Sequence, residues 1–80
     1  MYKLTVKFHW VDNTLERIRP RYSLKKKIYR YRGELVEDIE NKEDKQCKIV
    51  ALFENKDDAV LVFNMIKKWN SVKEAEVREL

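Results

Sequence analysis

The sequence predicts a small α+β domain in which helix covers one face of a small antiparallel sheet. Apolar and polar residues alternate without a break over residues 2–10, which is typical of a half-buried strand. Residues 56–69 have the cap and the apolar face of an amphipathic helix, and strand-like segments stand on both sides of it. The resulting element order is ferredoxin-like, βαββαβ. The alternative is a β-meander with a C-terminal helix and an edge strand.

The first strand has an apolar residue at every second position, namely Tyr2, Leu4, Val6, Phe8 and Trp10. Its other face carries Lys3, Thr5, Lys7 and His9. We therefore expect one face of the sheet to meet a core and the other to meet water or a partner.

Residues 13–22 allow two interpretations. Asn13 and Glu16 have the spacing of a capping box, which favours a short or irregular helix that Pro20 ends early. Leu15, Ile18 and Tyr22 fall on one face of that helix. Alternatively, residues 12–13 form a hairpin turn and the next segment pairs back on the first strand. From about residue 26 to residue 32 the composition predicts strand, and Gly33 then offers a bulge or a turn.

The C-terminal half is easier to interpret. Residues 34–46 predict a continued strand or a short helix, with a loop over residues 42–45 in either case. Residues 47–53 are apolar on both faces, which is typical of a central strand. Asn55 is a good N-cap for a helix that we expect to end at Trp69. Its predicted core face is Ala59, Val62, Phe63, Met65, Ile66 and Trp69. Residues 73–80 predict a closing edge strand.

Size and composition predict one folded domain, residues 1–80. The chain is 44% hydrophobic and 40% charged, which is too apolar for disorder and too charged for a membrane span. Its longest apolar runs, 49–53 and 59–63, are far shorter than a membrane helix. A single cysteine cannot form an intramolecular disulfide. We therefore expect a cytoplasmic protein.

The most informative segment is Arg17–Arg32, which we name the basic strip. Half of its sixteen residues are basic, none is acidic, and three tyrosines lie among them. Its eight positive charges exceed the net charge of +4, so the other 64 residues sum to −4. The sequence therefore describes a dipolar molecule with one strongly positive region.

The basic strip predicts a small nucleic-acid-binding protein. Each Lys or Arg that neutralises a phosphate releases a condensed counterion, and a tyrosine can stack on an unpaired base. The predicted phosphate contacts are Arg17, Arg19, Arg21, Lys25, Lys26, Lys27, Arg30 and Arg32. Tyr29 and Tyr31 are predicted to stack, unless they form the core-facing side of their segment. Lys3, Lys7 and His9 are expected to extend this surface.

The alternative is a protein-binding regulator or inhibitor. The same strip would then dock on an acidic or nucleic-acid-binding surface of a larger protein, with charge setting the association rate. The residues are identical in both hypotheses, so the sequence does not separate them. Val60 and Leu61 lie off the core face of the second helix, which suggests a homodimer or partner contact there.

We predict no enzymatic activity, metal or cofactor. His9 is the only histidine and is expected at the surface, and Cys47 is expected to be buried and unreactive. One His and one Cys cannot complete a zinc site. The carboxylates of residues 34–44 are interpreted as a solvated face that balances neighbouring cations. A lone strand-end acid, Asp12, is weak evidence for a nuclease.

Overall fold

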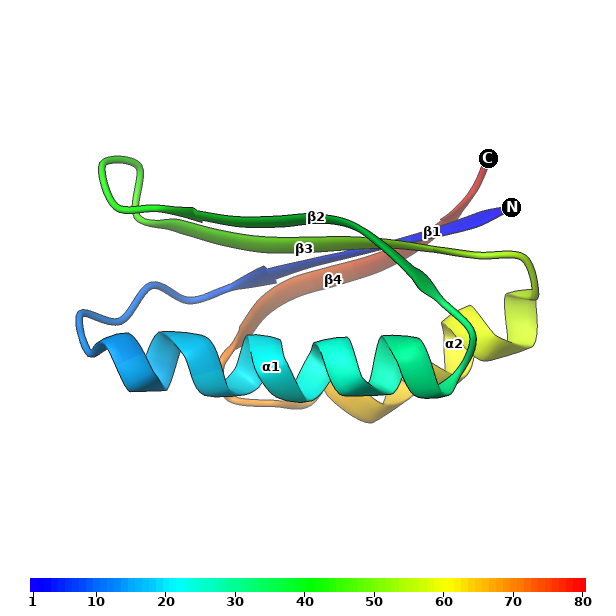
Figure 1. The fold of residues 1–80 in the computed structure, drawn as a ribbon, viewed down its shortest axis with the longest axis horizontal. Helices are drawn as coiled ribbons and strands as arrows, with labels where there is room; N and C mark the ends of the chain where they lie inside the picture. Colours follow the sequence, from blue (N-terminus) through cyan, green and yellow to red (C-terminus); the bar gives the residue numbers. More distant parts are fainter.

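The computed structural model describes all residues, 1–80, and has the predicted element order. The elements are β1 (Tyr2–Phe8), α1 (Thr14–Arg30), β2 (Glu34–Asn41), β3 (Gln46–Phe53), α2 (Lys56–Ile66) and β4 (Val72–Glu79). The strands form one antiparallel sheet in the order β2-β3-β1-β4. Both helices cover the same face of this sheet, α1 along β2 and β3 and α2 along β1 and β4 (Figure 1). The ferredoxin-like prediction is confirmed, and the β-meander alternative is wrong because it lacks the first helix.

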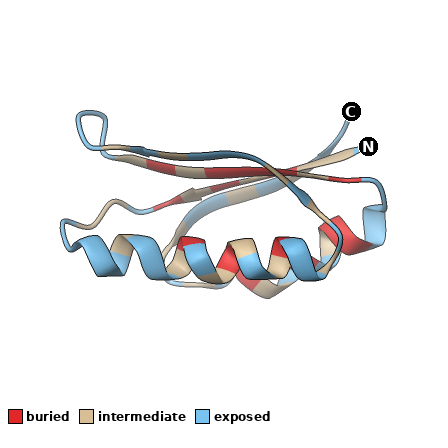
Figure 2. Ribbon diagram, viewed as in Figure 1, coloured by how far each residue is buried: buried red, intermediate tan, exposed pale blue.

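The core lies between the sheet and the two helices (Figure 2). The sheet contributes Leu4, Val6, Phe8, Cys47, Ile49, Ala51 and Phe53, and the helices contribute Leu24, Ile28, Ala59, Val62 and Ile66. The central strands β1 and β3 pair from Tyr2 with Phe53 to Phe8 with Cys47. Alternate side chains of a strand share a face, so this register brings the apolar faces of the two strands together. The predicted central position of residues 47–53 is confirmed.

Helix α1 differs most from expectation. It begins after Asn13, whose side chain accepts a hydrogen bond from the Glu16 N–H at 3.1 Å, and it continues through Pro20 for 17 residues. The expected early stop at Pro20 and the strand predicted over residues 26–32 are both wrong. Pro20 destabilises the helix because it has no backbone N–H for an intrahelical hydrogen bond. Burial of Leu24 and Ile28 against the sheet stabilises it. Tertiary packing therefore outweighs both the proline and the local strand preference.

A tight turn ends α1 and leads into β2. The Gly33 N–H donates to the Ile28 carbonyl at 2.7 Å, and Arg32 adopts the left-handed region with φ of 62°. A Cβ atom at Gly33 would lie only 2.6 Å from the buried ring of Phe53 and 2.8 Å from Ile28 Cγ2. The single glycine of the chain therefore stands where the backbone passes closest to the core.

Strand β2 contains a bulge that sets the direction of its acidic side chains. Its register against β3 shifts between Leu35 and Glu37, after which Asp38 pairs with Ile49 and Glu40 with Cys47. Ile49 and Cys47 face the helices, so the paired residues Asp38 and Glu40 also face α1. The helix considered for residues 34–46 does not form.

Helix α2 begins where predicted and ends earlier. The Asn55 side chain accepts a hydrogen bond from the Asp57 N–H at 2.8 Å. The helix ends at Ile66 instead of Trp69, although Trp69 still packs against the core. Val60 is half-buried and Leu61 is exposed. β4 pairs only with β1, which confirms the predicted edge strand.

Candidate functional site

The basic strip lies almost entirely on α1, and part of it faces the protein interior. Arg21 is only 8% exposed and donates from Nη1 to Asp38 Oδ1 at 3.0 Å and from Nη2 to Glu40 Oε1 at 2.6 Å. Lys25 forms a second ion pair with Asp38. The bulge in β2 makes these contacts possible because it turns both carboxylates toward the helix.

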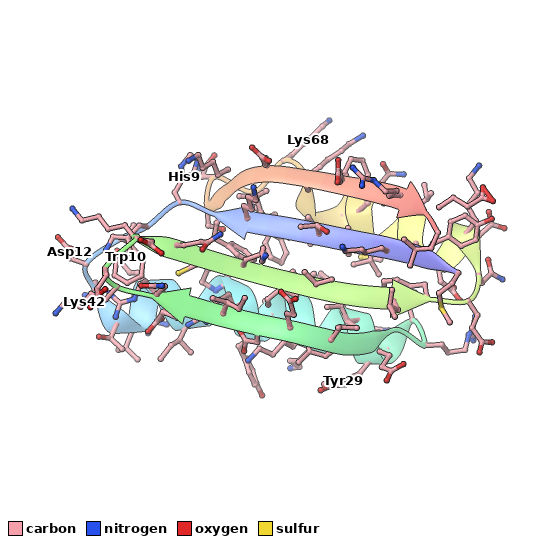
Figure 3. All side chains as sticks on the ribbon, turned by 90° about the horizontal axis from the view of Figure 1, so that it is seen from above. His9, Trp10, Asp12, Tyr29, Lys42 and Lys68 are labelled. Carbon is pink, nitrogen blue, oxygen red and sulfur yellow. The ribbon has the colours of Figure 1, made fainter.

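Arg17 fastens the β1–α1 connection to the helix. Its Nε donates to Glu40 at 3.1 Å, and its Nη1 donates to the carbonyls of Val11 and Asp12 at 2.8 and 2.9 Å. The guanidinium also lies over the Trp10 ring, 4.4 Å from its centroid. Trp10 and Asp12 lie together at this end of the molecule (Figure 3). Arg17 is therefore a structural anchor.

A fourth cation of the strip, Arg32, pairs across the fold with the start of α2. Its Nη2 lies 3.2 Å from Asp58 Oδ2, and the Asp58 side chain is largely buried. In total, four of the eight cations form intramolecular ion pairs, namely Arg17, Arg21, Lys25 and Arg32.

The side of α1 that points away from the sheet carries an exposed apolar stripe. Its members are Leu15, Ile18, Tyr22 and Tyr29, which are 58%, 45%, 60% and 64% exposed. Tyr29 projects past the β2 edge of the sheet (Figure 3). Sequence reasoning grouped Leu15, Ile18 and Tyr22 on one helical face without assigning that face to solvent. The positions of Leu24 and Ile28 assign the Leu15 face to solvent, because these two buried residues lie on the opposite side of the same helix.

A cationic stripe runs beside the apolar stripe. It consists of Arg19, Lys26, Lys27 and Arg30, which form no ion pair. Lys26 Nζ lies 5.5 Å from the centroid of the Tyr22 ring, and Lys27 Nζ lies 5.5 Å from that of Trp69. A shallow depression is lined by Ser23, Lys26, Lys27, Tyr29 and Arg30. The structure therefore joins apolar, aromatic and free cationic groups on one continuous helix face.

The remaining predicted site residues lie elsewhere. Tyr31 is half-buried and packs against the core, which separates it from exposed Tyr29. Lys3 and Lys7 alternate with the buried residues of β1, so they lie on the sheet face opposite the helices. They do not extend the α1 surface, and that expectation is wrong.

The chemically reactive side chains do not converge. Cys47 is buried, and burial raises the pKa of its thiol, an effect only partly offset by the nearby Arg21 guanidinium. His9 is exposed, and no three His, Cys, Asp or Glu side chains form a group that could hold a metal ion. The acids of β2 that face α1 form ion pairs with arginine and lysine side chains of that helix. Neither helix is long and apolar enough to cross a membrane.

No family model and no curated protein matches this chain. Among solved structures, the fold is similar to that of the P2 domain of the chemotaxis kinase CheA, in complex with the response regulator CheY, from the thermophile Thermotoga maritima. The TM-score is 0.60, the sequence identity is 12%, and the match covers 98% of this chain and 96% of that chain. This likeness shows the ferredoxin-like fold over the whole length of the chain.

Proposed function

We propose that this chain is a non-enzymatic protein-binding domain that docks the outer face of α1 on a larger protein. One observation carries the proposal: four large apolar side chains stay exposed in a row on α1, beside cations that form no ion pair within the domain. Exposed apolar side chains that gather in one row mark interaction surfaces, whereas scattered ones do not. Tyr and Arg, both present here, are the residues most enriched at binding hot spots.

The distribution of charge favours a protein partner over a polyanion. Four of the eight cations of the basic strip form ion pairs within the domain, which leaves four that form none. Phosphate-driven affinity depends on the number of cations engaged, so losing half of them lowers the affinity expected for nucleic acid steeply. The apolar stripe, in contrast, offers area that a protein surface can bury.

The fold comparison is consistent with this proposal. The CheA P2 domain was solved in complex with a response regulator, so a domain of this architecture and size can present a protein-binding surface. At 12% identity the likeness concerns the fold alone. The partner of this chain must therefore be inferred from its own surface.

Affinity capture with immobilised full-length protein tests the proposal. We expect a protein partner to remain bound at about 0.3 M salt after nuclease treatment, a condition under which purely phosphate-driven binding is largely lost. The variant Ile18→Ser with Tyr22→Ser should lose this partner. The matched control is Val36→Ser with Leu80→Ser, which removes two similarly exposed apolar side chains away from α1. Retention of the partner by the α1 variant would contradict the proposal.

A second candidate function is nucleic-acid binding, favoured by the depression that places Tyr29 beside Lys26, Lys27 and Arg30. With about four phosphate contacts, the log–log dependence of affinity on salt should have a slope near −3 to −4. A folded Tyr29→Ala variant that loses single-strand affinity would indicate base stacking. Capture of nucleic acid without any nuclease-resistant protein would promote this candidate.

A further inference from the structure

We infer that the outer face of α1 binds an acidic amphipathic helix of the partner protein, packed along the axis of α1. The inference rests on the proposed function and adds the chemistry of the partner. In this complex the apolar side of the partner helix covers the apolar stripe, and its carboxylates meet the cationic stripe.

The spacing of the apolar stripe matches a helix–helix seam. Leu15, Tyr22 and Tyr29 stand seven residues apart, and Ile18 stands three residues after Leu15. Leu15, Tyr22 and Tyr29 are then the a positions of a heptad and Ile18 is its first d position, in the repeat that keeps one seam facing a partner helix. The second d position is Lys25, which pairs with Asp38 at the edge of the seam. From Leu15 to Tyr29 the seam is about 21 Å long at 1.5 Å per residue. A seam of this length fits a helix of about four turns.

The flanking charges define the sign of the partner. In the same heptad Arg19 and Lys26 occupy successive e positions, where charged side chains select the partner helix. Both side chains are exposed and form no ion pair within the domain. Lys27 and Arg30 add positive charge on the same flank. Glutamate or aspartate on the partner helix would neutralise this flank.

A second copy of the chain does not meet this requirement. The basic strip contains no acidic residue, so two α1 outer faces would bring unpaired cations together. Glu16, in the first turn, is the one acid of α1, and Asp38 and Glu40 of β2 are already held by Arg21 and its neighbours. One carboxylate cannot balance the four unpaired cations of the facing copy. The occupant is therefore a different chain that supplies the carboxylates.

The test uses a display library of random peptides of about sixteen residues, about 24 Å as a helix, selected on the full-length protein. We expect enriched peptides to carry Leu, Ile or Phe at spacings of three and four, with Asp or Glu beside them. Synthetic copies should gain helical circular dichroism on binding, and amide shifts in the labelled protein should cluster on α1. Replacing the peptide acids with Lys should abolish binding.

Charge reversal on the protein supplies the matched control. Arg19→Glu with Lys26→Glu should weaken an enriched peptide at least about tenfold and should bind its Lys version better. Lys67→Glu with Lys68→Glu reverses two exposed lysines at the end of α2 and should change affinity less than about twofold. Each double variant lowers the net charge from +4 to 0, so a general charge effect would weaken both equally and overturn the inference.

Failure of the inference and failure of the proposed function give different results. Capture of a protein through α1, together with selected peptides that lack the acidic helical pattern or bind a sheet edge, overturns the inference alone. Peptides with the pattern but no nuclease-resistant protein partner in the capture experiment overturn the proposed function alone. Binding of phosphatidylserine vesicles or oligonucleotides to α1 without any peptide enrichment overturns both.

Discussion

The two sides of α1 have similar composition and opposite roles. The inner side carries Arg17, Arg21 and Lys25, all ion-paired with β2, and the outer side carries Arg19 and Lys26, which are unpaired. Figure 2 shows buried, intermediate and exposed residues alternating along the helix. Cations that are adjacent in sequence therefore differ in whether they stabilise the domain or remain free to bind. A count of charges along a chain does not reveal this difference, because the partner carboxylates come from a distant strand.

The division predicts its largest effect on two isoleucines of the same helix. Ile28 is fully buried and Ile18 is 45% exposed, so the same truncation to Ala tests both sides. We expect Ile28→Ala to lower the free energy of unfolding by about 2–5 kcal/mol. Ile18→Ala should change it by less than about 0.5 kcal/mol. Chemical denaturation measures both, and equal losses would show that α1 is rotated relative to the description given above.

The arginines provide the next comparison. Arg21→Ala leaves Asp38 and Glu40 facing α1 without their main partner, and these carboxylates keep partial contact with water. We expect a loss of about 2–3 kcal/mol, below the range for fully buried pairs. Arg19→Ala, on the outer side, should cost less than about 0.5 kcal/mol. A loss under about 1 kcal/mol for Arg21→Ala would show that the ion-pair network contributes little to the stability of the fold.

The elements with strong local patterns were predictable from the sequence. The period-two alternation of residues 2–10 and the Asn55 cap of α2 both act over a few residues. The structure confirms the cap and the strand, which ends at Phe8 instead of Trp10. Helix α1 was obscured because Pro20 and the β-like run over residues 26–32 give local signals that tertiary packing overrides.

The candidate site was predictable only in part. The basic strip and Tyr29 are visible as composition, and Tyr29 does lie on the surface. The pairing of Asp38 with Arg21 depends on the bulge in β2. No sequence pattern in residues 34–41 predicts this register shift. The exposed position of Leu15 depends on which side of α1 meets the sheet. Both are long-range properties.

A smaller effect is expected where the basic strip leaves the helix. Arg32 combines a left-handed backbone with an ion pair to Asp58. Arg32→Gly and Arg32→Ala remove the ion pair equally, and only Ala keeps the backbone strain. We expect the Gly variant to be more stable than the Ala variant by about 0.5–1 kcal/mol in thermal or chemical denaturation. If Ala is equal to or better than Gly, then Arg32 does not hold the left-handed conformation in solution.

The smallest effect concerns the buried thiol of Cys47 on β3, and it appears only at alkaline pH. Burial raises the pKa of Cys47, and Glu40 and Asp38 act in the same direction, whereas Arg21 and Arg17 lower it. Because the folded protein disfavours the thiolate, this contribution to stability is fully present below the unfolded pKa of about 8.5 and declines as pH rises toward the folded value. The difference in unfolding free energy between the native protein and Cys47→Ala should therefore be constant at neutral pH and shrink above about pH 8.5. Native protein should also react slowly with a thiol reagent and denatured protein quickly. A difference that grows with pH, or rapid labelling of the native state, would mean that the inner cations stabilise the thiolate more than burial opposes it.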